Sequence, residues 1–182
     1  MRLVTIQPYE VLEILQSRGR FVCDISKSGM IFDGDCGFLA AYDWLVSQME
    51  KRVGTAPIGV EYPIWAWYRN DDDYSDWNED GRKYAKITVE INPSRVLLSD
   101  FDEWHCVLNN CPLVDESLSE ADFDAEWDRC VAAGPEAVRA TWERIFHNDG
   151  GCVQATFWEL RLEDVVKVEV FTSRKRDEAE LE

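Results

Sequence analysis

Residues 62–69, YPIWAWYR, say more about the fold than any other segment of the chain. Their apolar side chains occupy both sides of an extended chain, because successive strand residues point to opposite faces. A strand that is apolar on both faces is typical of a buried position within a sheet. The segment therefore predicts a central strand with other parts of the protein packed against both of its faces.

Further strands are expected on either side of this segment. Short runs rich in β-branched and aromatic residues, bounded by turn residues, predict them. Such runs are RLVTI (2–6), RFVCDI (20–25), YAKITVEI (84–91) and RVLLSD (95–100). The run GCVQATFWELRLEDVVKVEVF (151–171) predicts two closing strands that divide near Glu163 and Asp164.

Helices are expected between these strands, where apolar residues recur at helical spacing. The expected helices are PYEVLEILQSRG (8–19), FLAAYDWLVSQMEKRVG (38–54), SLSEADFDAEWDRCVAAG (117–134) and PEAVRATWERIFHN (135–148). Pro8 suits the first position of its helix and Gly19 the stop, while Ser117 and Glu120 have the spacing of a capping box. Pro135 marks another helix start.

The length and order of these elements predict one α+β domain. A chain of 182 residues is long enough to bury a substantial core as a single unit. We expect mixed or antiparallel sheets with flanking helices over residues 1–171, and a charged tail that frays over residues 172–182.

The charge of the chain limits its partners. Against 19 lysines and arginines stand 36 aspartates and glutamates, giving a formal net charge of -17. Such a field disfavours tight non-specific binding of nucleic acid and binding to anionic membranes, and it favours basic protein partners. The opening MRLVTIQPYE turns polar at once, no apolar run is long enough to span a bilayer, and the six cysteines form no CxxC pair. We therefore expect a cytoplasmic protein with reduced thiols.

The stretch LLSDFDEWHCVLNN, residues 97–110, admits a structural and a functional interpretation. Asp100 follows an expected strand, where aspartate commonly caps a helix, and Trp104 with Leu108 would hold that helix to the core. His105 and Asn109 share a neighbouring face, where they either support a site or simply bond the backbone. We favour a structural corner, because caps are commoner than sites.

Neither of two candidate metal sites is complete. Residues 76–81, DWNEDG, match the start of an EF-hand loop, with Asp76, Asn78 and Asp80 as oxygen ligands and Gly81 at the turn. The twelfth position is Ile87 instead of the required glutamate, so a solvated acidic loop over Asp72–Asp80 is the better interpretation.

The second candidate is a zinc site. His105, Cys106 and Cys111 lie close together, but their spacing matches no standard zinc motif. We expect no bound metal.

Several long motifs resemble the bacterial family called domain of unknown function 3841. They are RLVTIQPYEVLEILQ, AYDWLVSQMEKR, YPIWAWYR and LLSDFDEWHCVLNN, which span residue 2 to about residue 112, and VQATFWEL at 153–160. The family name implies no activity.

The order of elements is also similar to the ADP-ribosyltransferase fold, which splits NAD in a cleft between two small sheets. In that fold the first strand has His or Arg and then Thr, and it leads into a helix that ends in Gly. LVTIQPYEVLEILQSRG resembles this unit, with Thr5 and Gln7 at those two positions. Thr5 is a departure from the pattern, since it lacks the charge and reach of His or Arg.

The resemblance extends to a nucleotide-binding set. FVCDISKS (21–28) corresponds to the strand and loop that carry a binding serine, offering Ser26 and Ser28. The ring that stacks on nicotinamide is then Phe38 or Tyr42, of which Tyr42 is preferred, although a ring at this helical position is equally a core residue.

The catalytic glutamate of the fold lies late in the chain. FWELRLEDVVKV resembles that strand, which makes Glu159 the candidate and places Gln154 upstream on the same strand. Because alternate residues of a strand point to the same face, Glu159 is expected on the same face as Phe157 and Arg161. The alternative is a surface glutamate that pairs with Arg161 or Lys83.

The resemblance implies that NAD is the substrate and that ADP-ribose passes to an unknown acceptor. Glu159 would stabilise the oxocarbenium ion, Thr5 and Gln7 would hold the nicotinamide riboside, and the pyrophosphate would bind Arg18, Arg20 and Lys27. The alternative is that these three cations form an exposed basic edge of the protein and bind no phosphate. The rival hypothesis is a non-enzymatic acidic module, antitoxin-like or phage-borne, that binds a basic protein.

Overall fold

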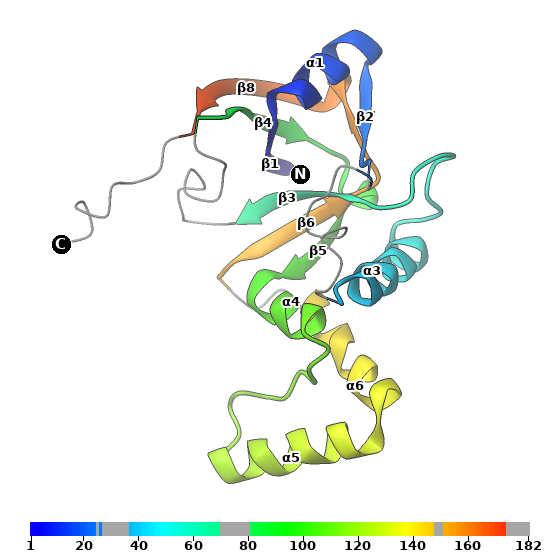
Figure 1. Cartoon of the computed structure of the whole chain (residues 1–182), viewed down its shortest axis with the longest axis vertical. Helices are drawn as coiled ribbons and strands as arrows, with labels where there is room; N and C mark the ends of the chain where they lie inside the picture. The colour runs from blue at the N-terminus through cyan, green and yellow to red at the C-terminus, as the bar shows by residue number, and fades with distance from the viewer. Residues whose placement is uncertain (25, 27–36, 70–80, 148–150, 174–182) are drawn as a thin grey trace, which may run out of the picture.

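The structure, a computed structural model, describes residues 1–24, 26, 37–69, 81–147 and 151–173. Its strands are β1 (Arg2–Pro8), β2 (Arg20–Val22), β3 (Ile64–Arg69), β4 (Lys83–Glu90), β5 (Leu97–Asp100), β6 (Val153–Phe157), β7 (Glu159–Arg161) and β8 (Val165–Thr172). Six of them form one antiparallel sheet in the order β5-β6-β3-β1-β4-β8, and β2 pairs with β7 in a second (Figure 1). The expected α+β fold with antiparallel sheets is confirmed.

The helices follow the expected order. They are α1 (Tyr9–Arg18), α3 (Leu39–Arg52), α4 (Phe101–Leu108), α5 (Glu120–Ala133) and α6 (Pro135–Thr141), with 3-10 turns η3 (Pro93–Arg95), η4 (Trp142–Phe146) and η5 (Leu162–Asp164). Gly19 ends α1 as predicted, with a left-handed φ of 74° and its N–H bonded to the carbonyl of Leu15. The predicted division at Glu163 and Asp164 is confirmed by η5.

Two expected helix starts are wrong by one or two residues. Pro8 is still part of β1, where it pairs with Tyr84, so α1 begins one residue later. The capping residue of α5 is Ser119 instead of Ser117, because the N–H of Ser117 is held in a turn by the Asp115 carboxylate. Ser119 Oγ accepts from the N–H of Asp122, and the helix starts at Glu120, the last residue of the predicted capping box.

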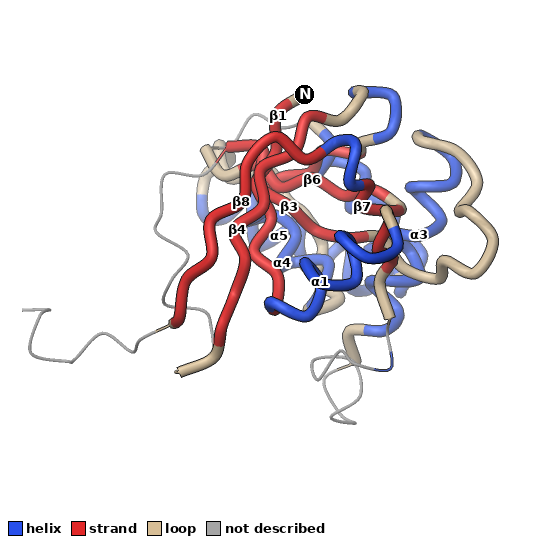
Figure 2. Tube along the Cα trace, turned by 90° about the horizontal axis from the view of Figure 1, so that it is seen from above, coloured by secondary structure: helices blue, strands red, loops and turns tan. Residues whose placement is uncertain are grey.

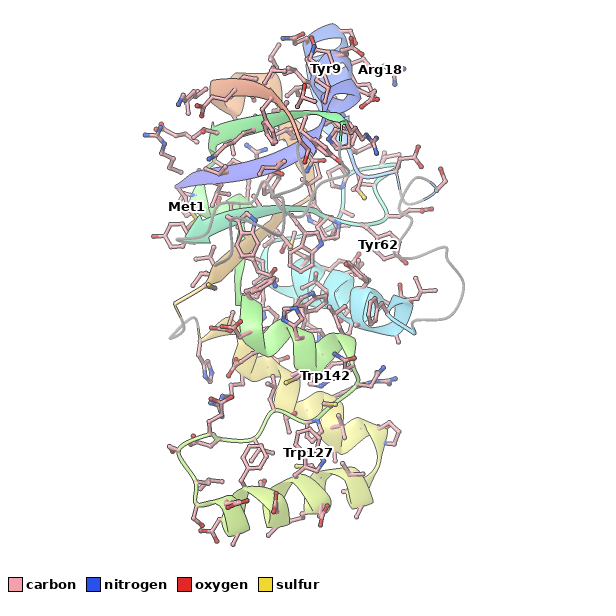
Figure 3. All side chains as sticks on the ribbon, turned by 60° about the vertical axis from the view of Figure 1, so that its left-hand side comes forward. Met1, Tyr9, Arg18, Tyr62, Trp127 and Trp142 are labelled. Atoms are coloured by element: carbon pink, nitrogen blue, oxygen red, sulfur yellow. The ribbon has the colours of Figure 1, made fainter. Side chains whose placement is uncertain are left out.

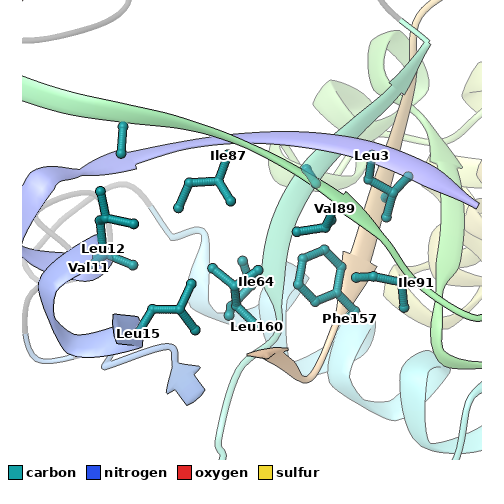
Figure 4. Packing of buried hydrophobic residues seen from close by; sticks show 13 residues of the cluster. Leu3, Val11, Leu12, Leu15, Ile64, Ile87, Val89, Ile91, Phe157 and Leu160 are labelled. Carbon is teal, nitrogen blue, oxygen red and sulfur yellow. The ribbon is translucent and has the colours of Figure 1, made fainter. Parts of the chain in front are cut away.

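β3 lies inside the sheet, between β6 and β1, and is covered on both faces as its sequence predicts. Ile64 and Ala66 belong to a core on the α1 side, which Figure 4 shows between the sheet and that helix. The members of this first core include Leu3, Val11, Leu12, Leu15, Ile87, Val89, Ile91, Phe157 and Leu160. Trp65 packs on the other face against a second core.

The second core lies between the sheet and α3, α4 and η4. Its largest buried members include Leu45 and Met49 of α3, Trp104 and Val107 of α4, and Trp142 and Ile145 of η4. Val138 of α6 is also buried in this core. Figure 2, a view from above, shows α1 on one side of the strands and places β8 beside β4 at the edge of the sheet.

The closing segment differs from its prediction because one strand breaks at Trp158. Trp158 turns into the second core and donates its indole N–H to the carbonyl of Gly54 at 2.9 Å. Phe157 and Leu160 both face the first core. Period two across this break is therefore wrong: Glu159 does not share the face of Phe157, and β7 leaves the large sheet to pair with β2.

α5 projects from the rest of the molecule and contacts chiefly α6 (Figure 1). Cys130 is the one residue of α5 that is fully buried, and Phe123 and Trp127 stack with ring centroids 6.0 Å apart. Among the described residues, no helix combines the length and apolarity that crossing a membrane requires.

Candidate functional site

Glu159 is a buried carboxylate at the junction of the two sheets. It opens β7, immediately after the turn at Trp158, and it pairs with Val22 across the small sheet. The residue is 7% exposed. Arg161 Nε donates to Glu159 Oε1 at 2.6 Å, and Arg20 Nε lies 3.5 Å from Oε2. The alternative interpretation, a surface glutamate paired with Arg161, is correct about the partner, but the glutamate is buried.

The arginines reach Glu159 through the reversal between α1 and β2. Arg18 ends α1, Gly19 turns the chain, and Arg20 opens β2 directly across from Arg161 of β7. The N–H of Leu162 donates to the Gly19 carbonyl at 2.9 Å, which ties the reversal to the end of β7. A glycine suits this turn because its φ is left-handed.

A pocket of about 660 Å³ opens at this junction. Its lining residues are Arg18, Gly19, Arg20, Glu159, Arg161, Leu162 and Glu163. Three arginines against two glutamates make its wall locally cationic, in a chain whose net charge is -17. The hydrogen bond to Glu159 raises the pKa of Arg161, so this guanidinium keeps its charge.

Two further hollows adjoin the Glu159 pocket through shared walls. One of about 150 Å³ shares Glu159 and Arg161 and is closed by Gly54, Thr55 and Trp158, among others. The other, of about 550 Å³, shares Arg18 and Arg20 with the pocket and adds Ile14, Phe21, Val22 and Asp24. Each of the three arginines of the pocket also lines one of the two adjoining hollows.

Thr5 and Gln7 are bonded to each other, away from these hollows. Thr5 is 1% exposed, and its hydroxyl donates to the carbonyl of Trp65 at 2.8 Å while it accepts from Gln7 Nε2 at 2.8 Å. Both polar groups thus support the pairing of β1 with β3. Neither residue lines any of the three hollows.

Gln154 and Tyr42 also lie outside the Glu159 pocket. Gln154 is buried within β6, opposite Ser99 of β5. Among the described residues, Gln154 Nε2 and Ser99 Oγ have no hydrogen-bond partner. The Tyr42 ring stands edge-on to Trp65 and Trp104, with centroids 6.2 and 5.7 Å away. These contacts are those of a core residue, the alternative to a ring that stacks on nicotinamide.

The loop after β2 is described only in part. The N–H and hydroxyl of Ser26 both bond Asp24 Oδ1, at 3.2 and 2.6 Å. Lys27 and Ser28 lie outside the described residues, as do the candidate EF-hand positions Asp76, Asn78 and Asp80. Gly81 is described as a left-handed turn residue whose N–H donates to the Ser173 carbonyl. In the described part of the chain, no group of three or more metal-ligating side chains forms a site.

Residues 97–110 form a capped corner. Asp100 Oδ1 accepts from the N–H groups of Asp102 and Glu103 at 2.9 and 3.0 Å. His105 Nδ1 lies 3.0 Å from the Phe101 carbonyl, and Asn109 Nδ2 donates to the His105 carbonyl at 2.7 Å. Both side chains are therefore used within their own helix, and neither lines the Glu159 pocket.

Sequence reasoning had not placed Gly19, Arg161 and Glu163 in a binding pocket. Arg161 was expected only as a possible partner of a surface glutamate, and Glu163 only as a division between strands. The available signal was the spacing of Glu159 and Arg161, which places both charges on one side of an extended chain. The pairing of β7 with β2 brings Arg18 and Arg20 to that side.

The family model described as domain of unknown function (DUF3841) matches residues 2–166. The chain belongs to this family. The match continues beyond the motifs of the first 112 residues, through α5, α6 and β7, and so includes every residue of the Glu159 pocket. No curated protein and no solved structure matches the chain.

Proposed function

We propose that this DUF3841 protein binds NAD along the small sheet and transfers its ADP-ribose to an acceptor. The observation that carries the proposal is the position of Glu159, a buried carboxylate in the wall between an arginine-lined pocket and a smaller hollow. A dinucleotide requires a cationic centre for its pyrophosphate with room on both sides, and the three adjoining hollows offer that arrangement.

The arginines supply the phosphate contacts of the proposal. Arg18 and Arg20 line both the central pocket and the hollow beside Phe21, so a pyrophosphate there would leave a nucleoside on each side. Guanidinium groups bind phosphate oxygens with paired, charge-assisted hydrogen bonds. The nicotinamide end then faces Glu159 and the hollow closed by Trp158.

Glu159 has one carboxylate oxygen free enough to act on a ribose. Oε1 is engaged by Arg161, whereas Oε2 is 3.5 Å from Arg20 Nε, longer than a charge-assisted hydrogen bond. Oε2 can therefore accept the ribose 2′-hydroxyl. Arg161 meanwhile holds the carboxylate in its orientation through the bond to Oε1.

The reaction breaks the bond between ribose C1′ and the nicotinamide nitrogen. Both electrons of that bond go to the pyridinium ring, so nicotinamide leaves neutral and positive charge develops on C1′ and the ring oxygen. The negative charge of Glu159 stabilises this oxocarbenium ion. The acceptor's nucleophile then forms a bond to C1′ and releases its proton to solvent.

The test is release of nicotinamide from labelled NAD by the full chain, with and without a cell lysate as a source of acceptors. We expect Glu159→Gln to lose at least about a hundredfold in release, because the neutral amide cannot stabilise the cation. Glu163→Gln is the matched control, since Glu163 lines the same pocket but its side chain is 75% exposed. Equal losses in the two variants, or no release and no NAD binding by the wild type, would contradict the proposal.

The exposed acidic face of α5 favours a second function, in which the protein binds a basic partner. Among its exposed residues are Glu120, Asp122, Asp124 and Asp128, with Arg129 as the only cation of the helix. Binding through such a face weakens steeply with salt. Capture of a basic protein that resists Glu159→Gln but is lost on Asp124→Lys and Asp128→Lys would support this function over the transferase.

A further inference from the structure

The outer edge of the large sheet is an eight-residue strand that, in the described part of the chain, has one neighbour. β8 pairs with β4 along most of its length, and no other described strand pairs with its second backbone edge (Figure 2). Three valines of this strand are exposed: Val166 by 51%, Val168 by 37% and Val170 by 46%. An edge strand with exposed apolar side chains is a template for pairing with another strand.

The two faces of β8 differ in character. Val168 and Val170 stand opposite Ile87 and Ala85 of β4, on the face that carries the first core. Lys167 and Glu169 lie on the other face, where Lys167 Nζ is 2.8 Å from Glu169 Oε2. The strand therefore presents Val168 and Val170 on one face, and Phe171 with one charge of each sign on the other. Val166 lies where the register with β4 shifts, so it is at a bulge of the strand.

We propose that β8 pairs antiparallel with β8 of a second copy, about a two-fold axis through Val168, so that the two large sheets become continuous. In this register Val168 lies opposite its own copy, and Val166 lies opposite Val170 of the second copy. Lys167 lies opposite Glu169 of the second copy. A two-fold interface is isologous, so every such contact occurs twice.

The charges of β8 favour a second copy as the partner and disfavour two of the neighbouring registers. A two-fold axis through Lys167 would place lysine against lysine, and one through Glu169 would place glutamate against glutamate. Like charges directly opposite are destabilising in antiparallel pairs, and opposite charges are favourable. Of these registers, the one centred on Val168 has complementary charges on one face and apolar contacts on the other.

The inference does not depend on the proposed NAD chemistry, because none of these strand residues lines the Glu159 pocket. Net charge affects the conditions of the test. Two copies that each carry -17 repel at low ionic strength, so association is measured at about 150 mM salt, where this repulsion is screened beyond about 8 Å.

The experiment is sedimentation equilibrium of the full chain from about 1 µM to about 1 mM. We expect a reversible dimer and no larger species, because the two-fold pairing occupies the β8 edge of both copies and leaves no β8 edge for a third. Val168→Lys, which places two lysines at the axis, should raise the dissociation constant at least about tenfold. Val131→Lys is the matched control, since Val131 is 53% exposed on α5, away from the edge.

A charge exchange tests the register itself. Lys167→Glu and Glu169→Lys should each weaken the dimer, because each creates a like-charge pair, and the double variant should recover most of the affinity. Melting temperatures show that each variant is folded. A chain that stays monomeric throughout the range overturns the proposal, as does a dimer that Val168→Lys leaves unchanged or a double variant weaker than both single ones.

Discussion

At the scale of single residues, the environment of Glu159 is set by two arginines that contact its buried carboxylate. Its neighbour in sequence, Arg161, binds one carboxylate oxygen, while Arg20 approaches the other from a different strand. Each arginine alone would be a surface cation. Burial of the carboxylate between them makes a local environment in which a developing positive charge can be stabilised.

Asp100 is the residue whose structural role is most directly testable. Its carboxylate accepts two backbone N–H groups at the start of α4 and is 6% exposed. Asp100→Ala should lower the free energy of unfolding by about 1–2 kcal/mol, measured by urea denaturation, because two helix donors lose their acceptor. Asp102→Ala, an exposed first-turn carboxylate, should cost at most about 1 kcal/mol. Equal losses would show that the cap contributes nothing beyond charge at the helix end.

At the scale of elements, the break at Trp158 controls where the site forms. β6 belongs to the large sheet and β7 to the small one, although only one residue separates them. That residue inserts its ring into the second core and bonds the Gly54 carbonyl. Without the turn, β7 would continue the direction of β6 and Glu159 would not meet β2.

Trp158→Phe removes the bond to Gly54 while it keeps an aromatic ring in the second core. We expect the free energy of unfolding to fall by about 1–3 kcal/mol, because a partly buried carbonyl loses its donor. The comparison is Trp127→Phe in α5, whose ring is half-buried and stacks on Phe123, and which should cost less. Thermal or urea unfolding measures both. A larger loss for Trp127→Phe would mean that α5 anchors the fold more strongly than the turn does.

At the scale of the whole molecule, the candidate site and α5 lie far apart. Figure 3 places Arg18 and Trp127 toward opposite ends of the longest axis. The site end is built around the first core and the small sheet, whereas α5 is held chiefly by α6. The proposed chemistry and the proposed partner binding would therefore use separate parts of the molecule.

This arrangement predicts uneven local stability. Amide hydrogens of α5 should exchange at least about a hundredfold faster than those of β1 and β4, because only Cys130 of that helix is fully buried whereas both strands lie inside the large sheet. Hydrogen–deuterium exchange read by mass spectrometry on peptides from 120–133, 2–8 and 83–90 checks this expectation. Equal protection in the helix and the strands would show that α5 unfolds only with the whole domain.

Local features of the fold followed from the sequence because the groups that make them lie within a few positions of one another. The central position of β3, the stop at Gly19 and the cap at Asp100 each depend on a short pattern and its immediate neighbours. The start of α5 was misplaced because the turn at Asp115 competes for the same local donors.

Only the tertiary structure decided which of the candidate residues share a pocket. Arg18 and Arg20 meet Glu159 because β2 pairs with β7, and that pairing depends on which core accepts Trp158. Thr5 and Gln7, expected at the same site, bond each other and a carbonyl of β3 instead. Strand periodicity says which residues share a face, but packing between distant segments determines where a strand turns and what it then faces.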